Sequence, residues 1–139
     1  FTSAPFMYQE LEDKRVHRVL NSYDVFGGAH TFNVVWATAK LYEGEPKVVQ
    51  AFLAALRTAM KEVNDDPAGS AALWVKADKS KLTPAEAEKI VRDKDNTWTM
   101  TPQKVMVVAD YMARVGMVPA KATSWKDMFV IDIHDLPGS

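Results

Sequence analysis

Cysteine is absent from the 139-residue sequence, and its absence removes three kinds of chemistry. The chain can form no disulfide, offers no thiolate to a metal ion and has no cysteine nucleophile. Cysteine-free chains are compatible with reducing and oxidising compartments alike, so the absence does not indicate where the protein acts.

Long apolar runs and an excess of basic residues are also missing. No apolar run approaches the roughly 20 residues that a helix needs to span a bilayer. Lys and Arg number 17 against 18 Asp and Glu, which gives a formal net charge of −1, and the basic residues are scattered. A nucleic-acid-binding surface normally shows a basic excess, so nucleic acid is not an expected partner.

The motifs of phosphate-binding and nucleophilic enzymes are missing too. There is no P-loop, no G-x-G-x-x-G and no G-x-S-x-G. His17, His30 and His134 lie far apart and lack the short spacing of metal ligands, so no metal site is expected. The carboxylates fit helix caps and solvated helix faces, and residue types alone assign neither a reaction nor a cofactor.

What the chain does have is one stretch rich in β-branched and aromatic residues. Residues 31–38, TFNVVWAT, lack strict polar and apolar alternation, which predicts a strand covered on both faces. Gly27 and Gly28 precede it and permit backbone conformations that a Cβ forbids, so we expect a bend or hinge there. A shorter strand is predicted at 15–20, followed by a turn at 21–24.

The rest of the chain predicts helices. Pro46, Pro67 and Pro84 suit first helical turns, and Thr83 with Glu86 forms a capping-box pattern. The predicted helices cover residues 8–11, 46–63, 66–78, 83–92 and 101–115, with a last short helix starting at Ser124. We expect helix for about half of the residues and two to four short strands.

Five stretches, in chain order, resemble one protein family: FTSAPFMYQEL, VHRVLNSYDVFGGAHTFNVVWATAK, EPKVVQAFLAALRTAM, TWTMTPQKVMVVADYMARVG and SWKDMF…IHDLPGS. They are similar to the C-terminal part of periplasmic substrate-binding proteins of ABC importers, of the nitrate, sulfonate and taurine type. That branch shares its fold with pyrimidine-precursor proteins. The resemblance covers nearly the whole chain. It implies an α/β, helix-rich fold that forms the C-terminal part of a two-lobed, type II periplasmic binding protein.

The resemblance also implies a domain division. Residues 1–28 would be a remnant of the second lobe and the return crossing, and residues 29–139 the C-terminal part of the first lobe with its outer helices. The N-terminal half of such a fold is missing, which would explain why the strand at 31–38 has few partners. Because the chain starts at Phe1 without Met, we expect either processing or a fragment of a longer polypeptide. The missing half, or a second copy of the chain, is therefore an expected partner.

By the same resemblance, the protein would be a periplasmic solute receptor without catalysis or cofactor. It would capture a small anionic ligand, such as a sulfonate or nitrate, between two lobes and deliver it to a membrane permease. Thr2, Ser3, Phe6 and Thr31 are then candidate ligand contacts, and Gly27 and Gly28 are the candidate hinge. Hydroxyl and backbone N–H groups suit an oxyanion because they donate hydrogen bonds without burying a fixed charge. The chain by itself is expected to bind weakly.

Two alternatives stay open. One is an enzyme on the same fold, like the pyrimidine-precursor synthases, which would bind a pyridoxal-type cofactor and use His17 or His30. The other is an independent helical interaction module. The module requires the segment 31–38 to be covered within this chain, because an unpaired apolar strand promotes association.

Overall fold

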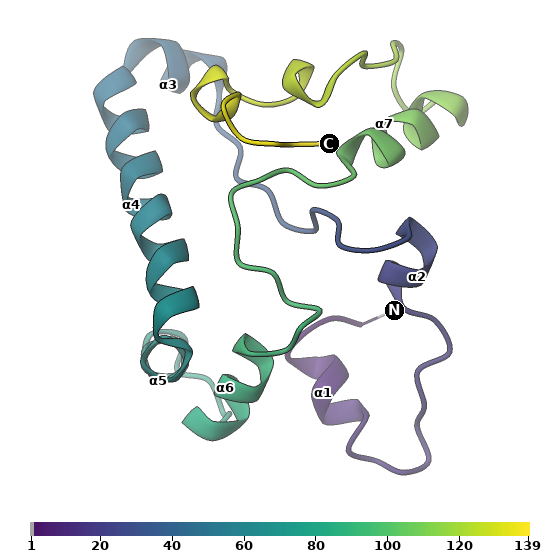
Figure 1. The fold of residues 1–139 in the computed structure, drawn as a ribbon, viewed down its shortest axis with the longest axis vertical. Coiled ribbons are helices and arrows are strands. Elements are labelled where there is room, and N and C mark those ends of the chain that lie inside the picture. The colour runs from purple at the N-terminus through teal and green to yellow at the C-terminus, as the bar shows by residue number, and fades with distance from the viewer. Residues whose placement is uncertain (1) are drawn as a thin grey trace. The chain divides into compact units, whose positions relative to one another are not determined.

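The structure is a computed structural model that describes residues 2–139, and helices account for 52% of the chain. Figure 1 shows the order of the elements along the ribbon. They are α1 (Phe6–Glu10), α2 (Ser22–Phe26), α3 (Ala39–Gly44), α4 (Pro46–Asp65), α5 (Pro67–Asp78), α6 (Pro84–Val91), α7 (Val105–Arg114) and two 3-10 helices, η1 (Trp125–Asp127) and η2 (Ile131–Ile133). Among the described helices, none combines the length and the hydropathy that a membrane span needs.

The predicted α/β fold is wrong for this structure. Residues 2–139 contain no strand and no sheet, so they do not form part of a type II binding-protein fold. The two segments predicted as strands, 15–20 and 31–38, run without regular secondary structure. The physical reason is that a strand is stabilised by hydrogen bonds to a neighbouring strand, and neither segment pairs with the other.

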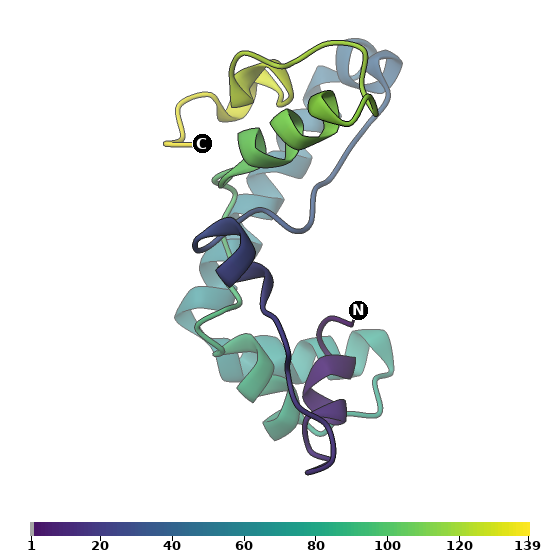
Figure 2. The same ribbon diagram turned by 90° about the vertical axis from the view of Figure 1, so that its right-hand side faces the viewer.

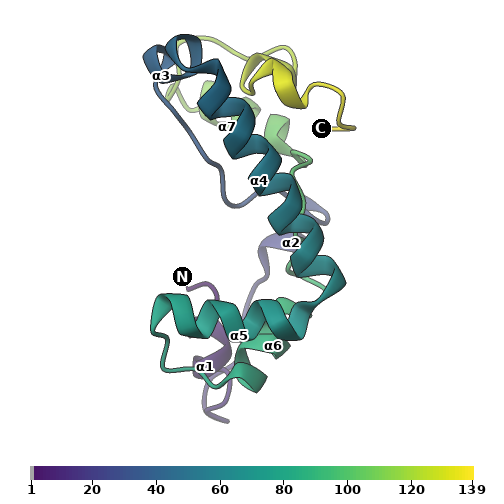
Figure 3. The same cartoon turned by 90° about the vertical axis from the view of Figure 1, so that its left-hand side faces the viewer.

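The chain divides into two compact units. The first unit comprises Phe1–Val19 and Thr38–Trp98 and holds α1, α3, α4, α5 and α6. In Figure 3 the chain turns sharply where α4 ends and α5 begins, and α6 lies beside α5. The turn is at Asp66, whose side chain caps α5 while Pro67 occupies the first helical position.

The core of the first unit lies between α5 and α6. Ala71 and Ala87 are fully buried, and their small side chains allow the two helices to approach closely. Leu82, Ile90 and Val91 complete the buried cluster. The predicted capping box at the start of α6 is confirmed, since the side chains of Thr83 and Glu86 each bond the other's backbone N–H.

The second unit comprises Leu20–Ala37 and Thr99–Ser139 and holds α2, α7, η1 and η2. In Figure 2 the chain runs from α7, in green, to the C-terminal turns, in yellow. The last residue lies against the start of α7, because the Ser139 carbonyl accepts a hydrogen bond of 2.8 Å from the Val105 amide. Trp125 of η1 is buried and contacts the rings of Phe129 and His134 edge-on.

Two predicted boundaries in the second unit differ from the structure. α7 begins at Val105 and not at Thr101, because Lys104 adopts a left-handed conformation with φ +52° that a helix cannot contain. The predicted turn at 21–24 is the start of α2, which Asn21 caps by accepting a hydrogen bond of 3.2 Å from the Tyr23 amide.

Candidate functional site

The predicted hinge glycines lie at the C-terminal end of α2, and Gly27 caps this helix in a left-handed conformation. Gly27 has φ +68° and Gly28 has φ +126°. Residues that carry a Cβ rarely adopt either value. Lys104 reaches this turn from the start of α7 and donates hydrogen bonds from Nζ to the carbonyls of Phe26, at 2.8 Å, and Gly27, at 2.5 Å. A positive charge at a helix C-terminus satisfies carbonyls that have no partner within the helix. The ammonium group of Lys104 therefore holds this turn in place.

Thr31 fastens the same loop to the residue before Lys104. Its amide donates to the Gln103 carbonyl over 2.9 Å, and its Oγ1 accepts from the Gln103 amide over 2.8 Å. The side-chain oxygen of this candidate ligand contact is thus already used as an acceptor. A hydroxyl can donate as well as accept, so the Thr31 hydroxyl can still donate a hydrogen bond.

His30, a candidate residue of the enzyme alternative, lies on the same loop. Its ring stacks on Phe26 with the ring centroids 4.3 Å apart, and its Nδ1 lies 3.3 Å from the Gly28 carbonyl. Lys104 bonds the neighbouring carbonyls, so its ammonium group is engaged as a hydrogen-bond donor. His17, by contrast, is exposed in the first unit.

The other candidate ligand contacts lie at the N-terminus, in the first unit. Thr2 and Ser3 are exposed, and Phe6 at the start of α1 is 62% exposed. The Ser3 carbonyl accepts a hydrogen bond of 3.0 Å from the Met7 amide, which fastens the segment to α1. The six predicted residues thus fall into two groups, one in each unit.

A polar network joins α1 to the turn after α6. The Tyr8 hydroxyl donates to Asp93 Oδ2 over 2.7 Å and accepts from Asn96 Nδ2 over 3.2 Å. Burial, with the hydrogen bond to Asp93, raises the pKa of the Tyr8 phenol. The Asp95 amide and then the Tyr8 hydroxyl lower the pKa of the Asp93 carboxyl, because both donate to its charged form.

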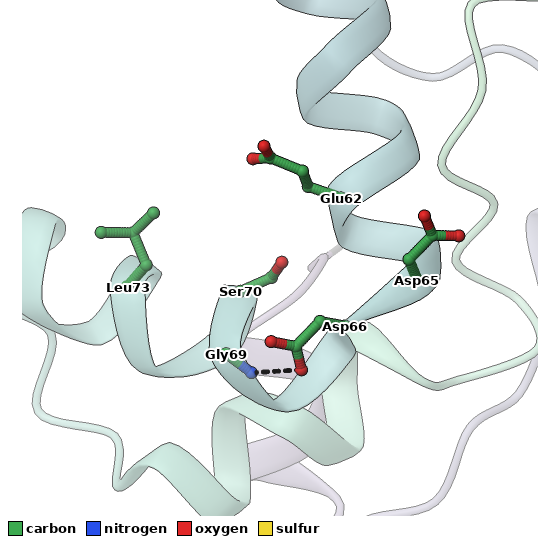
Figure 4. A pocket seen from close by; sticks show the side chains of 6 residues that line it. All are labelled: Glu62, Asp65, Asp66, Gly69, Ser70 and Leu73. Atoms are coloured by element: carbon green, nitrogen blue, oxygen red, sulfur yellow. Dashed lines mark hydrogen bonds between the residues drawn. The ribbon is translucent and has the colours of Figure 1, made fainter.

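An open pocket of about 360 Å³ lies where α4 meets α5. Figure 4 shows the residues that line it, which are Glu62, Asp65, Asp66, Gly69, Ser70 and Leu73. Glu62 and Asp65 point to different sides of α4, and Asp66 accepts a hydrogen bond of 2.9 Å from the Gly69 amide. Three carboxylates repel an anion, so this pocket does not suit an anionic ligand.

The carboxylates of this pocket do not converge on a common point either. Within residues 2–139, no group of three or more His, Asp or Glu side chains is placed to hold a metal ion.

The most unusual surface of the second unit is the segment 31–37. Phe32 is 73% exposed, Val34 58%, Val35 69% and Trp36 82%. In the described chain, the backbone groups of residues 32–37 form no hydrogen bonds with other backbone groups. The segment therefore offers both apolar side chains and unpaired peptide groups to a partner.

Sequence reasoning did not find Lys104, Gln103, Tyr8 or Asp93. Lys104 bonds carbonyls 77 and 78 positions away, and Tyr8 bonds Asp93 across 85 positions. No local periodicity or spacing signals such pairs.

The chain matches no protein-family model, and neither a curated protein nor a solved structure is significantly similar to it.

Proposed function

We propose that this chain is part of the solute-binding component of an ABC importer. In this role the protein acts in the periplasm, captures a small anionic solute such as a sulfonate or nitrate, and delivers it to a membrane permease without catalysing a reaction. The five stretches that resemble nitrate, sulfonate and taurine receptors support this proposal because they follow the family order along nearly the whole chain.

The observation that carries the proposal is the exposure of Phe32, Val34, Val35 and Trp36. Side chains of these types are usually buried, and a contiguous exposed group of them marks a protein contact. A polypeptide outside these 139 residues would cover the segment in the complete receptor. This agrees with the resemblance, which relates the chain to one part of a longer protein.

The described chain offers exposed hydroxyl groups that can donate hydrogen bonds to an anion. Thr2 and Ser3 are exposed and able to donate, whereas Lys104 is engaged with two carbonyls. A ligand held by hydroxyl and amide donors needs many of them at once, since each contributes about 1 kcal/mol. The chain alone therefore binds its solute weakly, and the complete receptor supplies the remaining donors.

The test compares the complete product of the gene that encodes these residues with the 139-residue chain. Isothermal titration calorimetry with taurine, an alkanesulfonate and nitrate measures the affinity of each protein. The proposal expects micromolar or tighter binding of one anion by the complete product and at least about a hundred-fold weaker binding by the chain. Micromolar binding by the chain alone, or no binding by the complete product, would overturn it.

One observation favours a second candidate, an independent helical interaction module. The first unit is helical and has its own core between α5 and α6. The same titration separates the candidates, because a module binds a protein partner and none of the three anions. The exposed segment 31–37 weighs against the module, which requires this segment to be covered within the chain.

A further inference from the structure

The segment 31–37 is not only exposed but also uncharged. No Asp, Glu, Lys or Arg occurs between Asp24 and Lys40, and the segment contains neither Pro nor Gly. It has no helix to unfold, and its peptide groups at 32–37 form no backbone hydrogen bonds in the described chain. Neutral, β-branched and aromatic segments of this length pair readily with other strands.

We propose that two copies of the chain pair through this segment as antiparallel strands centred on Val34. In this register Val34 lies opposite Val34 of the second copy. Phe32 of each copy lies opposite Trp36 of the other copy, so this aromatic pair forms twice. Side chains alternate between the faces of a strand, so these three residues share one face. Direct aromatic pairs and pairs of β-branched residues are among the cross-strand contacts that stabilise antiparallel pairing.

Neighbouring registers are less favourable. Centring the pair on Val35 places Phe32 opposite Thr38, and centring it on Asn33 places Trp36 opposite His30. Only the register about Val34 pairs the two large aromatic side chains with each other twice. The absence of charge also means that two identical segments do not repel each other, which favours a second copy as the occupant.

This inference concerns the 139-residue chain alone and does not depend on the proposed function, since no solute is needed to test it. The first measurement is the molar mass of the chain by light scattering and sedimentation over a range of concentrations. We expect a reversible dimer for the wild type. Val34→Lys places two like charges opposite each other and should weaken association about ten-fold or more.

The matched control is Val19→Lys. Val19 is 86% exposed and lies outside the segment, so this variant should dimerise like the wild type. Far-ultraviolet circular dichroism should show unchanged helix content in both variants, because neither residue lies in a helix. A wild type that stays monomeric, or a Val34→Lys variant that dimerises like Val19→Lys, would overturn the proposal.

The register can be measured because the chain contains no cysteine. In antiparallel pairing about Val34, residue 33 faces residue 35 of the second copy. A mixture of Asn33→Cys and Val35→Cys should therefore oxidise to a mixed disulfide dimer faster than either variant alone, with Val19→Cys as the control. Faster self-linking of each single variant would indicate parallel pairing and contradict the proposed register.

Discussion

The hydroxyl of Tyr8 donates a hydrogen bond of 2.7 Å to Oδ2 of Asp93, although 85 positions separate the two residues. Asn96 extends this contact by donating both to the Tyr8 hydroxyl and to the Ile90 carbonyl. The network thereby fastens α1 to the turn after α6, within the first unit. It makes the stability of this unit depend on the charge of one carboxyl group.

The first prediction concerns this carboxyl group and pH. Asp93→Asn should lower the free energy of unfolding by about 1–2 kcal/mol at neutral pH, because a charged acceptor binds its donors more strongly than an amide does. The pKa of Asp93 is lowered in the folded state, so its contribution is fully present above the ordinary pKa of 3.8 and is lost as the pH falls through the lower folded value. Urea unfolding of both proteins across this pH range measures the difference.

The control for this prediction is Tyr8→Phe, which removes one donor and leaves the carboxyl group. It should cost about 1 kcal/mol at neutral pH. A difference between wild type and Asp93→Asn that persists unchanged at strongly acidic pH would contradict the assignment.

The second prediction concerns Gly69, in the first turn of α5. A Cβ at this position would lie 2.1 Å from Oδ2 of Asp66, the residue whose Oδ1 caps the helix by accepting from the Gly69 amide. Gly69→Ala should therefore displace the cap and destabilise the protein by about 1 kcal/mol, although alanine is the better helix former. Thermal unfolding measures the change.

Gly44→Ala is the matched control, because Gly44 is also helical and a Cβ there meets nothing within 4 Å. This variant should be neutral or slightly stabilising. In an Asp66→Ala background the cost of Gly69→Ala should largely disappear, since the cap is already lost. If the stability losses of the two single variants simply add up in the double variant, displacement of the cap does not explain the effect of Gly69→Ala.

The third prediction concerns the Lys104 ammonium group. Lys104→Met should leave the carbonyls of Phe26 and Gly27 without their charged donor and loosen the turn at Gly27 and Gly28. The expected cost is about 1.5–3 kcal/mol for losing bonds to a charged group. Hydrogen exchange should accelerate at the amides of Gly28 and Thr31 but not in α5 and α6, which belong to the other unit. Lys47→Met, at an exposed position in α4, should change neither region.

The fourth prediction concerns the small core between α5 and α6. Ile90 is 4% exposed, so Ile90→Ala should cost about 2–5 kcal/mol through lost burial and the cavity that remains. Leu73→Ala is the control, because Leu73 is 65% exposed in α5 and should change stability little. Chemical unfolding monitored by circular dichroism measures the stability of both variants. Equal losses in the free energy of unfolding would contradict the placement of the core.

Local chemistry made most helices of this protein predictable. α4, α5 and α6 begin at the three prolines identified in the sequence, and the capping box of Thr83 and Glu86 forms as expected. These signals act within a few residues, through hydrogen bonds between a cap and the first helical turn. They hold whatever the rest of the chain does.

By itself, the sequence determined where α4, α5 and α6 start, but its prediction of a covered strand at 31–38 was wrong for the described residues 2–139. Only the tertiary structure decided that the segment has no strand partner within residues 2–139, that Lys104 interrupts the predicted start of α7, and that Tyr8 meets Asp93. The reason is the range of the forces involved. A helix satisfies its own backbone hydrogen bonds locally. A strand, or a hydrogen bond between distant side chains, depends on groups that the fold brings from far along the chain.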